Sequence, residues 1–184
     1  MSERSRLVEL LIRRSVQHGE FHLAGGQRSG YYIDARRTTM SAEGLALVGQ
    51  LGLAAIRNAG WAPTAVGGLT LGADPVAYAI AAASCSTPPL VDAFTVRKDP
   101  KAHGTRRRVE GNLGPSDRVV VVEDVITSGA SARQAIAAVE EAGAEVLGVL
   151  GLVDRLAGGR QAIETGGHEV VVIATIRDLG LEPD

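Results

Sequence analysis

Apolar residues recur along this chain with two different periods. Runs at helical spacing, such as Leu7, Leu10 and Leu11 in the first of them, predict amphipathic helices. The predicted helices span residues 3–17, 41–60, 74–84 and 130–142, with a further one between 153 and 169. We expect Ser41 and Asp74 to be N-caps, because their side-chain oxygens can accept hydrogen bonds from the first turn. Gly143 is expected to follow the end of the fourth helix.

The second kind of pattern is the short, unbroken apolar run, which predicts a buried strand. Such runs cover 65–69, 90–96, 118–123, 145–153 and 169–175, and a shorter strand is expected at 31–35. The runs alternate with the predicted helices, and this arrangement is typical of a parallel sheet covered on both faces. A length of 184 residues fits a single α/β domain.

One segment, residues 97–114, does not fit these layers. It has no apolar period and is rich in basic residues: Arg97, Lys98, Lys101, His103, Arg106, Arg107 and Arg108. Loops of this length inside a compact domain are usually functional lids or disordered segments. For Arg106 to Arg108, a solvated run of surface charge is the alternative interpretation.

Charge and composition narrow the class of protein. The net charge of −2 creates no field that would recruit nucleic acid or an anionic membrane. No apolar run approaches the ~20 residues that span a bilayer, and the N-terminus lacks the apolar core of a signal peptide. We therefore expect a cytoplasmic protein. The single cysteine, Cys85, excludes an internal disulfide and is expected to be a small buried hydrophobe. His18, His22 and His168 do not have the spacing of a zinc site.

The stretch "VVVVEDVITSGAS" (119–131) combines chemistry of two kinds. Glu123 and Asp124 end a predicted strand, where parallel sheets bind their ligands. The turn that follows opens a helix, whose free N–H groups favour an anion, and Gly129 allows close approach. A ribose 5-phosphate would satisfy both features, since its hydroxyls suit the carboxylates and its phosphate suits the turn. An ordinary strand-to-helix turn with capping residues is the alternative.

The same stretch resembles the phosphoribosyl-pyrophosphate (PRPP) binding motif of type I phosphoribosyltransferases. "RKDPKAHG" (97–104) resembles the catalytic loop of the orotate phosphoribosyltransferase family, and "SGYYID" (29–34) and "LVDRLAGG" (152–159) resemble two further segments of it. The resemblance implies a five-stranded parallel sheet flanked by helices. It also implies a small N-terminal hood, made of about residues 1–40 plus a C-terminal segment, and a flexible catalytic loop at 97–114. The implied reaction converts orotate and PRPP to orotidine 5′-monophosphate and pyrophosphate, a step of pyrimidine biosynthesis.

The resemblance also implies roles for individual residues. Lys101, His103 and Asp124 would be catalytic. The PRPP contacts would be Arg97, Lys98, Lys101, His103, Glu123, Asp124, Val125, Ile126, Thr127, Ser128, Gly129, Ala130 and Ser131. Thr127 and Arg155 would contact orotate, although Arg155 could instead form a surface pair with Asp154. Mg²⁺ would be bound mainly through the pyrophosphate of PRPP rather than in a protein cage. A homodimer is implied, in which Lys98 acts across the interface.

Some positions depart from the family pattern, and two other functions stay open. Ala24, Thr70 and Leu71 stand where many members of the family carry cations or a tyrosine. The alternatives are a phosphoribosyltransferase for another base and a PRPP-sensing regulator that has lost catalysis. The basic loop and Arg155 favour the orotate enzyme, and the sequence shows no nucleic-acid module that such a regulator would need.

Overall fold

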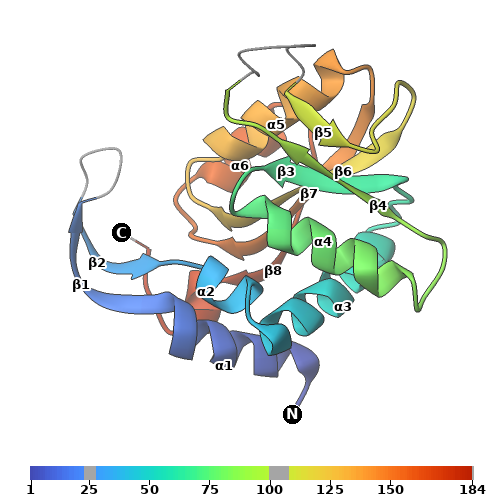
Figure 1. The fold of residues 1–184 in the computed structure, drawn as a ribbon. Helices are drawn as coiled ribbons and strands as arrows, with labels where there is room; N and C mark the ends of the chain where they lie inside the picture. Colours follow the sequence, from blue (N-terminus) through green and yellow to red (C-terminus); the bar gives the residue numbers. More distant parts are fainter. Residues whose placement is uncertain (23–27, 100–107, 184) are drawn as a thin grey trace.

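The computed structural model describes residues 1–22, 28–99 and 108–183 (Figure 1). The elements follow one another in this order: α1 (Glu3–Ser15), β1 (Val16–His22), β2 (Arg28–Ile33), α2 (Arg36–Thr39), α3 (Ala42–Asn58), β3 (Ala65–Leu69), α4 (Ala73–Ser84), β4 (Asp92–Val96), β5 (Val109–Gly111), β6 (Arg118–Ile126), α5 (Ala130–Glu141), β7 (Glu145–Asp154), α6 (Gly159–Thr165), β8 (Val170–Thr175) and the 3₁₀ helix η1 (Ile176–Leu179).

The main sheet has six strands in the order β5-β4-β3-β6-β7-β8, where the resemblance implied five. The five predicted strands are all present and run parallel to one another. The sixth, β5, pairs antiparallel with β4 at the edge, with Val96 opposite Val109. Part of the segment that was expected as one long loop, 97–114, is therefore sheet. The three residues of β5 are half-buried or exposed, so no apolar pattern marked them as a strand.

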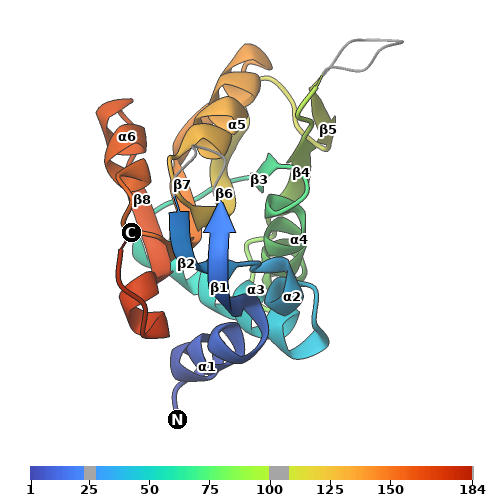
Figure 2. The same ribbon diagram turned by 90° about the vertical axis from the view of Figure 1, so that its left-hand side faces the viewer.

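Helices cover both faces of this sheet, as the alternation along β6 requires. Val120 and Val122 pack with α3 and α4 in one apolar cluster. Val119 and Val121 point the other way and pack with α5 and α6 in a second cluster. Successive side chains of a strand face opposite sides, so an unbroken run of valines serves both cores. Figures 1 and 2 show these two helical layers on either side of the strands.

A separate hairpin, β1–β2, stands over one end of the main sheet. Val16 pairs with Ile33 in antiparallel register. Ser29, Tyr31 and Ile33 are buried, whereas the residues between them are exposed. Figure 2 places the hairpin in front of β6 and β7. The strand expected at 31–35 is thus β2, shifted towards the N-terminus, and its partner β1 was not predicted because "VQHGEFH" carries no clear apolar alternation.

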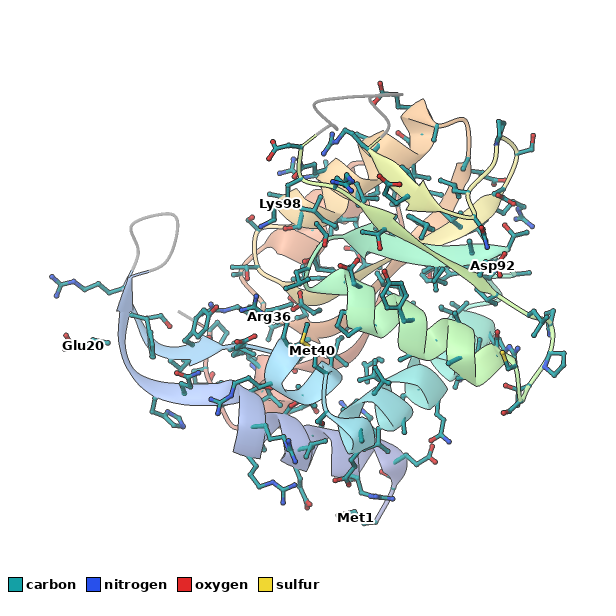
Figure 3. All side chains as sticks on the ribbon, in the orientation of Figure 1. Met1, Glu20, Arg36, Met40, Asp92 and Lys98 are labelled. Atoms are coloured by element: carbon teal, nitrogen blue, oxygen red, sulfur yellow. The ribbon has the colours of Figure 1, made fainter. Side chains whose placement is uncertain are left out.

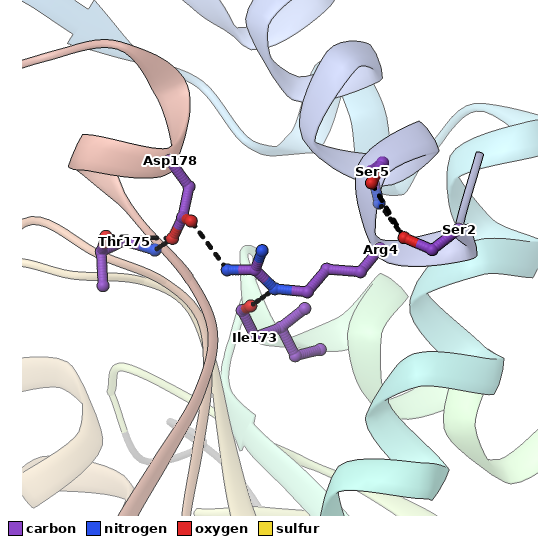
Figure 4. A network of polar contacts seen from close by, with 6 residues as sticks. All are labelled: Ser2, Arg4, Ser5, Ile173, Thr175 and Asp178. Atoms are coloured by element: carbon purple, nitrogen blue, oxygen red, sulfur yellow. Dashed lines mark hydrogen bonds and ion pairs between the residues drawn. The ribbon is translucent and has the colours of Figure 1, made fainter.

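The N-terminal helix α1 is joined to the end of β8 and to η1 (Figure 4). Arg4 on α1 donates from Nε to the carbonyl oxygen of Ile173 at 2.9 Å and pairs with Asp178 at 2.8 Å. Asp178 also accepts from the backbone N–H and the hydroxyl of Thr175, which caps η1. Ser2 caps α1 by accepting from the N–H of Ser5. These contacts fasten α1 to the segment after β8.

The capping predictions have mixed outcomes. Ser41 caps α3 and accepts from the N–H of Gly44 at 3.2 Å, as predicted. Gly143 follows α5 with a left-handed φ of 87°, also as predicted. Asp74 is not an N-cap, because α4 already begins at Ala73. Its carboxylate instead accepts from the hydroxyls of Thr70 and Thr95, at 2.6 and 2.9 Å.

The prediction of a buried Cys85 is wrong, since this residue lies in solvent just past the end of α4. Within residues 1–22, 28–99 and 108–183, no helix combines the length and the apolar character needed to cross a membrane.

Candidate active site

A cavity of about 750 Å³ opens where the carboxyl ends of β3, β6 and β7 face the hairpin. Its walls come from five separate parts of the chain: Tyr32, Ile33, Asp34, Arg36, Leu69, Thr70, Leu71, Gly72, Lys98, Glu123, Asp124, Val125, Thr127, Ser128, Ser131, Arg155 and Ala157. The carboxyl edge of a parallel sheet is the usual place for a ligand. The size suits a small molecule of several functional groups.

Two neighbouring carboxyl groups form part of the cavity wall. Burial, reinforced by the negative charge of Asp124, raises the pKa of Glu123 to about 8. Among the described residues its Oε2 atom has no hydrogen-bond partner. Burial also raises the pKa of Asp124, although the N–H of Val125, which donates to Oδ1 at 2.9 Å, and the charge of Arg36 oppose that rise. The pair thus offers acceptors that the protein itself leaves partly unused.

Next to the carboxyl groups, the turn between β6 and α5 forms a smaller cavity of about 90 Å³. It is lined by Glu123 and by residues 125–131. Gly129 caps α5 with a left-handed φ of 71°. A methyl group at this position would stand 2.7 Å from the carbonyl oxygen of Gly159, so the turn fits closely against α6. The backbone conformation and the lack of space both call for glycine, and the resulting helix N-terminus suits an anion.

Basic side chains face this acidic pair from two other elements. Arg36 on α2 is held by Asp34, with Nε 2.7 Å from Oδ1, and this contact lowers the pKa of the Asp34 carboxyl group. Lys98, just after β4, is exposed and also lines the cavity. Figure 3 shows both residues on the side of the molecule where the hairpin stands. Arg36 was not predicted from the sequence, because only the fold brings α2 to the edge of the sheet.

The loop after β3 forms the cavity wall at the positions that depart from the family pattern. Thr70, Leu71 and Gly72 all line the cavity. The N–H of Thr70 donates to the carbonyl oxygen of Val96 at 2.8 Å, and the peptide bond between Thr70 and Leu71 is cis. Gly72 packs directly on the carboxylate of Asp124, leaving no room for a side chain.

Arg155 follows β7 and points into the same cavity, although it is only 5% exposed. Its Cζ atom lies 4.8 Å from the centre of the Tyr31 ring. The alternative of an exposed ion pair with Asp154 is wrong, because both side chains are buried. Asp154 uses Oδ1 to accept from the N–H of Leu156 at 2.8 Å.

The structure brings together most of the described residues that the resemblance assigned to a ligand. Those that line one or both cavities are Lys98, Glu123, Asp124, Val125, Ile126, Thr127, Ser128, Gly129, Ala130, Ser131 and Arg155. Arg97 does not line them and instead pairs with Glu110 on β5 at 2.9 Å. Lys101, His103, Ala24, Arg106 and Arg107 lie outside the described residues. Arg108 is half-buried and donates to the carbonyl oxygens of Arg97 and Lys98, rather than standing free in solvent.

Comparison with known proteins gives a consistent result. The model of the phosphoribosyl transferase domain matches residues 42–165. The orotate phosphoribosyltransferase of Rhodopirellula baltica is 44% identical over 181 residues, which cover 96% of this chain and 94% of that protein. The one of Aquifex aeolicus is 45% identical over 182 residues, covering 97% of this chain and 98% of that protein.

Solved structures lead to the same family. The orotate phosphoribosyltransferase of Mycobacterium tuberculosis H37Rv, in complex with Fe(III) dicitrate, superposes with a TM-score of 0.87 at 45% identity and covers 98% of this chain and 100% of its own. A structure of that enzyme in complex with PRPP has a TM-score of 0.82 at 40% identity, with the same coverage. The fold is therefore that of the type I phosphoribosyltransferases, with a sixth strand at the edge of the sheet. On sequence and structure alike, the chain belongs to the orotate phosphoribosyltransferase family.

Proposed function

We propose that this chain transfers the 5-phosphoribosyl group of PRPP to orotate, which yields orotidine 5′-monophosphate and pyrophosphate for pyrimidine biosynthesis. The observation that carries the proposal is the arrangement of the main cavity. An acidic pair, a helix N-terminus and a buried arginine all meet there. A phosphorylated sugar and an anionic base need these three groups in one place.

The turn after β6 suits the 5-phosphate of PRPP. Backbone N–H groups at the start of α5 and the hydroxyls of Thr127, Ser128 and Ser131 would donate to its oxygens. Glu123 and Asp124 lie at the end of the same strand, where the ribose hydroxyls would donate to them. The Oε2 atom of Glu123 has no partner in the described part of the chain, and this supports the placement because a buried acceptor without a partner is costly.

The opposite wall suits the pyrophosphate that leaves. Bond breaking at the anomeric carbon places positive charge on the sugar and negative charge on the leaving group, as in glycoside chemistry. The carboxylate of Asp124 would stabilise the positive charge on the sugar. The cations of Arg36 and Lys98 would stabilise the negative charge on the pyrophosphate, together with Lys101 and His103 as the family resemblance implies.

Arg155 and Thr127 would hold orotate beside the ribose. A guanidinium presents several N–H donors in one plane, which matches a carboxylate and neighbouring ring carbonyls. Because Arg155 is buried, its contacts with an anionic base would be stronger than those of an exposed arginine.

Mg²⁺ would be held in this cavity mainly through the phosphates of the substrate. The described residues contain no group of three His, Cys, Asp or Glu side chains that could hold a metal. Mg²⁺ prefers oxygen ligands and often binds through substrate phosphates, so the pyrophosphate of PRPP would supply them. When bound, the ion neutralises negative charge on the leaving group.

The wider organisation is proposed on the family resemblance. We expect a cytoplasmic homodimer in which Lys98 reaches the partner's site. We also expect α1, the hairpin and α2, with the segment after β8, to act as a hood over the cavity, and the segment around 97–114 to act as its catalytic loop. Lys98 lines the cavity of its own chain, at the start of that segment, so a role beside the pyrophosphate within one chain is the alternative to action across the interface.

The direct test is consumption of orotate, followed by its ultraviolet absorbance after addition of PRPP and Mg²⁺. Hypoxanthine, adenine and uracil serve as alternative bases under the same conditions. Of these bases, we expect only orotate to be converted. Turnover with one of the other bases and not with orotate would favour a phosphoribosyltransferase of different specificity. PRPP binding without turnover of any base would favour a sensor.

A further inference from the structure

The guanidinium of Arg155 is supported by the β1–β2 hairpin from outside the ligand space. Its Cζ atom lies 4.8 Å from the centre of the Tyr31 ring. Its Nη2 atom donates to the hydroxyl of Ser29 at 3.5 Å. Arg155 lines the main cavity, whereas Tyr31 and Ser29 do not. Residues 126 positions apart are thus in contact immediately behind the proposed orotate position.

The side chain of Ser29 is held by the backbone of Tyr31, two residues along β2. The hydroxyl of Ser29 donates to the carbonyl oxygen of Tyr31 at 2.8 Å and accepts from its N–H at 3.3 Å. Both side chains are buried, with exposures of 4% and 6%, because they share the inward face of β2. A buried aromatic face is therefore presented to Arg155, and such a face attracts a guanidinium through its π electrons.

The ring of Tyr31, rather than its hydroxyl, makes this contact. The Oη atom is buried and has no hydrogen-bond partner among the described residues. A hydroxyl in that position does not fix the ring, and its removal should have little effect on Arg155. The two parts of the side chain can therefore be tested separately.

We propose that Tyr31 is a positioning residue that sets the affinity for orotate by orienting Arg155 before the base binds. A long arginine side chain that is free to move loses conformational entropy when a ligand fixes it, and a preformed orientation removes this loss. The proposal rests on the assignment of Arg155 to orotate in the proposed function. It adds the N-terminal hairpin to the groups that decide how tightly the base is held.

A double-mutant cycle tests the proposal through the KM values for the two substrates. We expect Tyr31→Leu to raise the KM for orotate about tenfold, the effect of losing a buried cation–π contact, with the KM for PRPP within about twofold of the wild type. In an Arg155→Ala background the same substitution should change the orotate KM by less than about twofold, because the residue it acts through is gone. Tyr31→Phe is the matched control and should retain the wild-type KM.

Three outcomes would overturn the proposal. Equal increases in both KM values would show that Tyr31 only supports the fold. A full effect of Tyr31→Leu in the Arg155→Ala background would show that it acts independently of Arg155. An unchanged orotate KM in Arg155→Ala itself would remove the assignment of Arg155 in the proposed function, and this inference with it. If Tyr31→Leu does not fold, Ser29→Ala replaces it in the same cycle, with an expected increase of about threefold in the orotate KM alone.

Discussion

Glu123 and Asp124 are single residues at which the needs of ligand binding conflict with the stability of the folded protein. Both carboxyl groups sit where burial raises their pKa values. A core residue of similar size without charge would be easier to accommodate. The cost is understandable if a ligand supplies the missing hydrogen-bond donors, which the ribose hydroxyls of PRPP would do.

The raised pKa of Glu123 predicts how the stability of the free protein depends on pH. The folded protein retains this proton up to about pH 8, whereas the unfolded chain releases it near 4.5. The folded state therefore binds more protons across that window, and its stability should fall as pH rises through it. Glu123→Gln cannot titrate. The melting temperature of this variant minus that of the wild type should therefore rise from pH 4.5 to about 8 and stay constant above that pH.

Thermal melting at several pH values, without ligands, measures this difference. Each kcal/mol should appear as a shift of about 2–4 °C for a chain of this size. Glu9→Gln, on the exposed side of α1, is the control for removing a surface charge. A difference between Glu123→Gln and wild type that stays constant across the window would show that Glu123 is already ionised in the folded protein.

At the scale of elements, the turn between β6 and α5 depends on Gly129. Alanine there would adopt a left-handed backbone at a cost of about 1–2 kcal/mol and would also press on Gly159. Relief of that contact should displace the turn, so we expect Gly129→Ala to raise the KM for PRPP as well as to lower stability. Steady-state kinetics and thermal melting report the two effects separately.

Gly167 provides the matched control for this prediction. Its φ of 92° is also left-handed, but a methyl group there would meet nothing within 4 Å. Gly167→Ala should therefore cost stability through backbone strain alone and leave the KM for PRPP unchanged. Similar KM values for the two variants would mean that the turn does not need its observed shape to bind PRPP.

The sequence predicted elements well where local pattern and burial agree. The strand β3 at Ala65–Leu69 was predicted at its observed bounds, because its five residues are all buried and flanked by helices. The strands β1 and β5 were missed, because hydrogen bonding to a neighbouring strand decides them rather than any apolar alternation. The role of Arg36 was missed for a related reason, since only the tertiary fold brings it near Asp124.

For the whole molecule, the proposed homodimer predicts that two subunits share their sites. If Lys98 acts in the partner's site, Lys98→Ala and Asp124→Asn should each be nearly inactive alone. A mixture that exchanges subunits should recover activity, because one site of the heterodimer carries both defects and the other carries neither. The measurement is the rate of orotate consumption before and after exchange. Exchange without recovery would place the action of Lys98 within its own chain.

In the proposed reaction, this cavity couples the departure of pyrophosphate to the capture of orotate. The decisive measurement is pyrophosphate release from PRPP, followed together with orotate consumption in wild type and in Asp124→Asn. We expect one pyrophosphate per orotate consumed, almost none without orotate, and a rate at least about 100-fold lower in the variant, which should still fold. Pyrophosphate release that is as fast without orotate, or as fast in Asp124→Asn, would contradict it.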